Sequence, residues 1–255
     1  MEKVDIVYFS GSGTTREIAR QLAEELAGAV AEHDLVRNPP QEDCAFGSDE
    51  AVVFALPVYG GRLPGVCVDM LRKFHGAGTR AVAVVVYGNR AFDDALLELS
   101  DVLDEQGFVT VAAAAFVAQH SLFPKVAAGR PDASDRGKIS EFARLCEGAL
   151  AAGEARRVEV PGNRPYVQAG AVSLQPSGNA KCNGCGTCAR LCPTGAIDAA
   201  DPRKTDKSRC IACTACIAAC PQGARGFHTP IVYPLVGAVF AAGVKERRDP
   251  EFFLQ

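Results

Sequence analysis

The segment from Cys182 to Pro221 constrains this chain more than any other, because it contains two copies of one cysteine pattern. Each copy reads C-x2-C-x2-C-x3-C-P, and the second begins at Cys210, 28 positions after Cys182. Three thiolates at these short spacings converge on three irons of one cubane, and the fourth, placed before a proline, reaches the other cubane. The repeat therefore predicts two [4Fe–4S] clusters.

The same pattern predicts crossed ligand sets for the two clusters. We expect the first cluster to be bound by Cys182, Cys185, Cys188 and Cys220, and the second by Cys210, Cys213, Cys216 and Cys192. A zinc site is the alternative, but zinc favours paired CxxC knuckles with four tetrahedral ligands, which a third equally spaced cysteine fits poorly. The other three cysteines, Cys44, Cys67 and Cys146, lack ligand spacing.

Charge is distributed unevenly along the chain. Up to Val160 there are 16 Lys and Arg against 24 Asp and Glu, a net charge of −8; from Pro161 onward there are 11 against 6, a net charge of +5. Basic residues around iron–sulfur clusters offset the negative charge of the clusters. The basic part lacks the interleaved aromatic residues of a nucleic-acid platform, so we expect no nucleic-acid partner.

The N-terminal sequence MEKVDIVYFSGSG lacks the basic and apolar regions of a signal peptide. The longest apolar run, residues 231–244, is too short to span a bilayer. We therefore expect a cytoplasmic protein without a membrane span, in which clustered thiols bind metal and do not form disulfides.

The first 157 residues alternate between strand-like and helix-like patterns. The strands are expected at 4–9, 33–37, 51–56, 81–87 and 108–117, and the helices at 15–30, 65–74, 93–106 and 134–150. Continuous apolar strands that alternate with helices predict an α/β fold, a parallel sheet covered on both faces. We expect five strands in the order 2-1-3-4-5.

The rest of the chain divides by composition. Residues 158–180 gain Pro and Gly and lose periodicity, so they are expected to be a linker. Residues 181–226 would form a small α+β domain around the two clusters. Residues 227–255 would be a C-terminal extension that packs on the body, because Phe252 and Phe253 near its end favour burial.

A glycine- and hydroxyl-rich loop follows the first expected strand. It contains Ser10, Gly11, Ser12, Gly13, Thr14 and Thr15 and leads into a helix, whose N-terminus favours an anion. Arg16 occupies the place of the last glycine of a dinucleotide fingerprint, and no P-loop lysine is present. An ordinary βα turn is the alternative to a phosphate site.

This loop also fits the form [ST]-x-[ST]-G-x-T, and in that respect the N-terminal part resembles flavodoxins. The cysteine repeat resembles bacterial two-cluster ferredoxins, whose usual continuation matches Gly195 to Asp198. The whole chain resembles the flavodoxin–ferredoxin fusion proteins of anaerobic bacteria and archaea. The resemblance implies a flavodoxin-like fold and FMN, with the FMN phosphate on the Ser10–Thr15 loop.

Two further loops would then border the flavin ring, because they too follow strands at the carboxyl edge of the sheet. One contains Pro57, Val58, Tyr59, Gly60 and Gly61, and the other contains Tyr87, Gly88, Asn89, Arg90, Phe92 and Asp93. Tyr59 is the candidate for stacking on the ring, with a surface aromatic as the alternative. Asn89 and the Gly88 backbone would address the pyrimidine edge of the flavin. Arg90 would contact the ring edge, dock a partner or remain solvated.

Together these cofactors predict electron transfer, because FMN exchanges two electrons and each cluster exchanges one. The first hypothesis is an oxidoreductase that acts on a small molecule, for which His120 and Arg90 are the catalytic candidates; His120 belongs to the polar 118–131 loop. The alternative is a non-catalytic carrier or adaptor between partner redox proteins, because no nicotinamide fingerprint is present. In both cases a redox partner protein supplies or accepts electrons.

Overall fold

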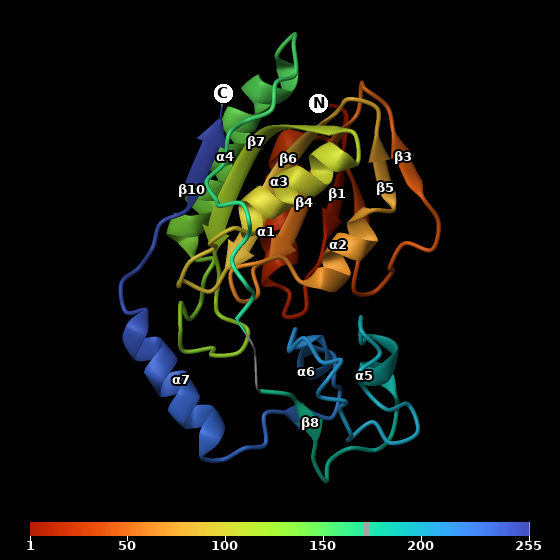
Figure 1. The fold of residues 1–255 in the computed structure, drawn as a ribbon, viewed down its shortest axis with the longest axis vertical. Coiled ribbons are helices and arrows are strands. Elements are labelled where there is room, and N and C mark those ends of the chain that lie inside the picture. The colour runs from red at the N-terminus through yellow and green to blue at the C-terminus, as the bar shows by residue number, and fades with distance from the viewer. Residues whose placement is uncertain (171–173, 255) are drawn as a thin grey trace.

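A six-stranded sheet forms the centre of the computed structural model, which describes residues 1–170 and 174–254. Its strand order is β10-β7-β6-β4-β1-β2 (Figure 1). Five strands are parallel: β1 (Lys3–Tyr8), β2 (Ala29–Asp34), β4 (Ala51–Pro57), β6 (Thr79–Tyr87) and β7 (Phe108–Val117). The expected α/β fold and the order 2-1-3-4-5 are confirmed. The sixth strand, β10 (Glu251–Leu254), pairs antiparallel with β7 and was not expected.

Helices cover both faces of this sheet. One face packs against α1 (Thr14–Leu26) and α4 (Ala133–Ala151), and the other against α2 (Gly65–Leu71) and α3 (Ala95–Glu105). Every residue of β4 is buried, as the double cover requires. Because the five strands are parallel, their carboxyl ends all lie at one edge of the sheet.

Two sequence-based boundaries near the N-terminus were wrong. The first helix ends at Leu26 and not at residue 30, and β2 begins at Ala29 and not at residue 33. The Asp34 carboxylate accepts hydrogen bonds from the backbone N–H groups of Val36 and Arg37, at 2.9 and 3.0 Å. These bonds form a turn where a strand had been expected. A small parallel sheet of β3 (Cys44–Phe46) and β5 (Phe74–Gly76) was also missed.

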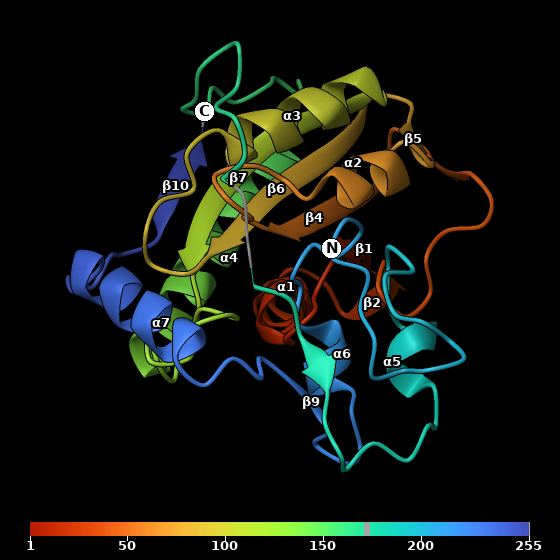
Figure 2. The same cartoon turned by 60° about the horizontal axis from the view of Figure 1, so that its bottom comes forward.

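The cysteine-rich segment forms a small module below the carboxyl edge of the sheet (Figures 1 and 2). We call residues 177–226 the cysteine module. It contains β8 (Ser177–Gly178), α5 (Thr187–Arg190), α6 (Ala215–Ala218) and β9 (Arg225–Gly226). Its two short helices begin after residues with positive φ, Gly186 at 71° and Thr214 at 64°, so the internal repeat of the sequence is also a repeat of structure.

The segment expected to be a linker, 158–180, is fixed to α3 over its first part; residues 171–173 lie outside the described residues. Asp94 accepts hydrogen bonds from the backbone N–H groups of Asn163 and Val167, at 2.8 and 2.6 Å. The bond from Val167 is the main reason that the pKa of Asp94 lies below its usual range. Asp101 binds the Arg164 side chain.

The C-terminal extension returns to the sheet through α7 (Val232–Gly243) and β10. The Phe252 ring of β10 lies 5.7 Å from the Phe116 ring and 5.0 Å from the Phe142 ring. The cysteine module is thus inserted between two elements of the sheet domain, α4 and β10, and is held at both ends. None of the described helices combines the length and the hydrophobicity that a membrane-spanning segment needs.

Candidate functional site

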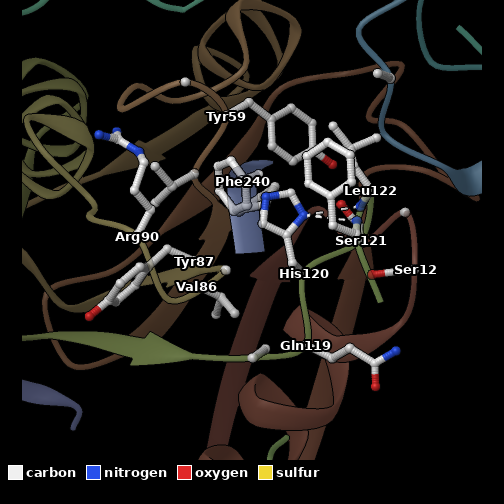
Figure 3. A pocket seen from close by; sticks show the side chains of 18 of the residues that line it. Ser12, Tyr59, Val86, Tyr87, Arg90, Gln119, His120, Ser121, Leu122 and Phe240 are labelled. Carbon is white, nitrogen blue, oxygen red and sulfur yellow. Dashed lines mark hydrogen bonds between the residues drawn. The ribbon is translucent and has the colours of Figure 1, made fainter. Parts of the chain in front are cut away.

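A cavity of about 430 Å³ opens at the carboxyl edge of the sheet, where all three expected loops meet (Figure 3). Its lining includes most of the residues expected to bind the flavin, namely Gly11, Ser12, Thr14, Thr15, Pro57, Val58, Tyr59, Gly60, Gly61, Tyr87, Gly88 and Arg90. Three loops that are far apart in sequence are therefore brought to one place by the strand order.

The loop between β1 and α1 has the geometry of an anion site. Gly13 precedes the helix with φ at 104° and, as the N-cap residue, provides no side-chain cap. The Ser12 and Thr14 hydroxyls lie 3.3 Å apart, and both residues line the cavity. Uncapped N–H groups and adjacent hydroxyls are what a phosphate group binds at a helix N-terminus. These residues fit the phosphate of FMN.

We expect Thr14→Val to weaken FMN binding about 10- to 100-fold, the usual effect of losing one hydrogen bond to a charged group. Titration of the flavin-free protein with FMN, followed by flavin fluorescence, measures the affinity. Thr14→Ser is the matched control, because it keeps the hydroxyl. Equal affinities for the two variants would place the phosphate away from this hydroxyl.

The loop after β4 is held from outside the cavity. Gly60 and Gly61 have φ values of 62° and 86°, which make the sharp turn after Tyr59. Arg62 donates to both oxygens of Glu98, at 2.8 and 2.7 Å, and its guanidinium lies 4.5 Å from the centre of the Tyr166 ring. The half-buried Tyr59 ring faces the cavity (Figure 3). Its position suits stacking on a planar ring.

Five expected residues do not line the cavity: Ser10, Gly13, Asn89, Phe92 and Asp93. The proposed contact of Asn89 with the flavin is corrected, because its amide nitrogen donates to the carbonyls of Val244 and Glu246, at 3.1 and 2.8 Å. Its oxygen accepts from Arg248 N at 3.1 Å. Asn89 therefore connects the loop after β6 to the C-terminal segment.

Three of the other four, Ser10, Phe92 and Asp93, have local side-chain partners. The Ser10 hydroxyl accepts from the backbone N–H of Arg16 at 3.1 Å. The Phe92 ring is buried against Tyr87, with ring centres 5.6 Å apart. Asp93 pairs with Arg90, whose side chain lies at the border of the cavity. These contacts hold the loops in shape, but Ser10, Phe92 and Asp93 themselves do not line the cavity.

The remaining walls of the cavity come from segments without a flavin motif. Gln119, His120, Ser121 and Leu122 follow β7, and Val232, Val236 and Phe240 belong to α7. The 118–131 loop had been singled out for its length and polarity. The apolar run at 231–244 was visible too, but nothing in it indicated which surface it covers.

Two small cavities in the cysteine module bring together the two expected ligand sets. One is lined by Cys182, Cys185, Cys188 and Cys220, and the other by Cys192, Cys210, Cys213 and Cys216. We name them the outer and inner cysteine cavities. Each therefore takes its fourth cysteine from the other copy of the repeat.

Three of the eight sulfur atoms lie close to a backbone N–H donor. Backbone N–H groups lie close to Cys192 Sγ (from Ala196, 3.2 Å), Cys220 Sγ (from Ala224, 3.2 Å) and Cys210 Sγ (from Ala212, 3.4 Å). All eight cysteines are free of disulfides. In the described part of the chain no three His, Cys, Asp or Glu side chains are placed to hold a single metal ion. Four thiols with amide donors around one space fit a [4Fe–4S] cluster.

The inner cysteine cavity adjoins the large cavity. Ile211 and Ala212 line both of them. The sheet domain and the cysteine module also touch at Gly11. This residue lies so close to Cys213 that a Cβ at position 11 would collide with the Cys213 carbonyl. The outer cavity shares no lining residue with the large cavity, and it includes Cys185, which is exposed.

Family comparisons match the two parts of the chain separately. Residues 5–88 match the family described as "Flavodoxin domain", and residues 167–225 match the family described as "4Fe-4S dicluster domain". No curated protein matches the chain significantly.

Solved structures similar to this chain include two flavodoxins and a larger oxidoreductase. A flavodoxin from the domain Archaea is 12% identical, with a TM-score of 0.41, over 59% of this chain and 99% of that one. Flavodoxin 2 from Bacillus cereus is 20% identical, with a TM-score of 0.41, over 58% and 97%. Rubredoxin oxygen:oxidoreductase from Desulfovibrio gigas is 18% identical, with a TM-score of 0.38, over 60% and 38%.

Proposed function

The chain is a fusion of a flavodoxin domain with a 4Fe–4S dicluster domain, and from this premise we propose that it passes electrons between two [4Fe–4S] clusters and FMN. FMN would occupy the large cavity, and the clusters would occupy the inner and outer cysteine cavities with the crossed ligand sets given above. Bound FMN supplies the ability to exchange electrons singly or in pairs. The protein would thereby couple one-electron to two-electron chemistry.

The observation that carries this proposal is the shared wall of Ile211 and Ala212 between the inner cysteine cavity and the large cavity. Both residues lie between the cluster ligands Cys210 and Cys213. Electrons held at the inner cluster would have only this short stretch of protein to cross. The cysteine module is attached at both of its ends, so this contact does not depend on a diffusional encounter.

The arrangement also supports an order for the route. The exposed Cys185 would leave the outer cluster open to a redox partner protein. Two cysteines of the inner set, Cys213 and Cys216, are buried, against one of the outer set, Cys188. Lys181 and Arg190, both exposed, flank the outer set. We infer a route from partner protein to outer cluster, inner cluster and FMN, or the reverse.

An oxidoreductase is favoured over a pure carrier by the walls of the large cavity. Side chains of the 119–123 segment and of α7 line it, so a small molecule at the flavin would meet a shaped and partly apolar surface. A carrier needs only an exposed edge of the flavin. We therefore keep the small-molecule substrate as part of the proposal.

Anaerobically purified protein should contain about eight irons and one FMN per chain. When it is mixed rapidly with a reductant that enters through the outer cluster, the cluster absorbance should bleach before the flavin spectrum changes. Zinc in place of iron would refute the cluster assignment. Flavin reduction that precedes cluster reduction under these conditions would refute the route. Reoxidation by candidate acceptors would then identify the substrate class.

A further inference from the structure

His120 lies directly after β7, where its imidazole ring has two distinct sides. Its Nδ1 atom accepts hydrogen bonds from the backbone N–H groups of Leu122 and Phe123, at 3.1 and 3.3 Å. A ring nitrogen that accepts two N–H groups carries no proton itself. In the neutral ring the single proton must then be on Nε2.

The surroundings keep this ring uncharged. It packs between the rings of Phe123 and Phe240, with centres 5.1 and 4.8 Å away, and it also lies against Leu122 and Gly88. None of these groups carries a charge. Burial lowers the pKa of His120 to about 4. At neutral pH the ring is therefore uncharged, and the one proton that it holds is on Nε2.

The Nε2 side of the His120 ring has no hydrogen-bond partner among the described residues. Within residues 1–170 and 174–254, hydrogen bonds of the His120 ring involve Nδ1 alone, and the residue lines the cavity beside Gly88 (Figure 3). A Cβ at position 88 would collide with Cδ2, the ring atom bonded to Nε2. The Cδ2 edge of the ring thus lies against the loop after β6.

We propose that His120 is a fixed, uncharged donor whose Nε2–H binds an acceptor atom of the flavin ring. This inference rests on the proposed function, because it assumes FMN in the large cavity. The carbonyl oxygens and ring nitrogens of the flavin are the acceptors to which such a group can donate a hydrogen bond. The two backbone bonds to Nδ1 make His120 a positioning residue for the flavin: they hold its ring in one orientation before the ligand arrives.

The test begins with the tautomer of His120 in the full-length protein. Nitrogen-15 NMR of the imidazole at neutral pH should show a protonated Nε2 and an unprotonated Nδ1, both with and without FMN. A cationic ring or a protonated Nδ1 would overturn the proposal. This readout does not depend on redox activity.

Two amide substitutions then separate the two sides of the ring. The Gln amide of His120→Gln reaches the position of Nε2, and the shorter amide of His120→Asn reaches only that of Nδ1. We expect His120→Gln to bind FMN nearly as tightly as the native protein, and His120→Asn and His120→Leu to bind about three- to tenfold more weakly, as for one neutral hydrogen bond. Thermal unfolding of the flavin-free variants verifies that each is folded.

Equal FMN affinities for His120→Gln and His120→Asn would overturn the role of His120 while FMN binding by the native protein stood. A native protein that binds no FMN at all would overturn the cavity assignment itself. The two failures are thus distinguishable.

Discussion

Replacing Cys192 with Ser is expected to lower the iron content from about eight to about four per chain and to remove the inner cluster. In sequence Cys192 ends the first copy of the repeat, but in the structure it lines the inner cavity with Cys210 and Cys213. Loss of one of four thiolates leaves an iron exposed to solvent and to oxidation. Iron analysis and electron paramagnetic resonance of the reduced protein measure which cluster remains.

The same variant tests the route of the electrons. With the outer cluster intact and the inner one absent, rapid mixing with reductant should still bleach the outer cluster but should reduce FMN far more slowly. Cys188→Ser is the matched control, since Cys188 lines the outer cavity with Cys185. Loss of the outer cluster in Cys192→Ser would mean that each copy of the repeat binds its own cluster. Unchanged FMN reduction would mean that electrons bypass the inner cluster.

Much of this arrangement was predictable because it depends on local sequence. The strand at 108–117 was placed correctly, since its continuous apolar run has the length and composition of a buried strand. The grouping of the cysteines could be predicted for a similar reason: short spacings and a terminal proline restrict which thiols can meet. Both features follow from patterns that can be recognised in the sequence itself, a continuous apolar run and a cysteine motif of known ligand pattern.

Features that depend on distant partners could not be predicted. The polar Asn89 follows a strand at the ligand edge of the sheet, which favours a ligand contact, yet it is 5% exposed and binds the backbone near Val244. That partner lies 155 positions away. The pairing of β10 with β7 is of the same kind: Phe252 and Phe253 indicated burial, but nothing local specified the edge strand. The turn at Asp34 was missed because it depends on hydrogen bonds from the backbone to the Asp34 side chain, which leave no periodic pattern in the sequence.

The contact between the sheet domain and the cysteine module could not be predicted either. A substitution at this contact is expected to change the rate of electron transfer. Gly11→Ala is expected to slow electron transfer between the inner cluster and FMN several-fold, because the rate of electron tunnelling falls exponentially as the distance between the two cofactors grows. Gly11 does not have a positive φ, so alanine causes no strain in the loop itself. Its Cβ would instead collide with the Cys213 carbonyl and lie 3.3 Å from the Ala215 backbone nitrogen.

Because backbone atoms cannot rotate away, the cysteine module must move away from the loop. Gly13→Ala is the matched control in the same loop: Gly13 has φ at 104°, and its Cβ would meet nothing within 4 Å. Strain of about 1–2 kcal/mol at that position should weaken FMN binding but leave the cluster-to-flavin rate unchanged in FMN-loaded protein. The two variants thus exchange effects: Gly11→Ala changes the rate and Gly13→Ala the affinity. If both changed only the affinity, the module would not transfer electrons through this contact.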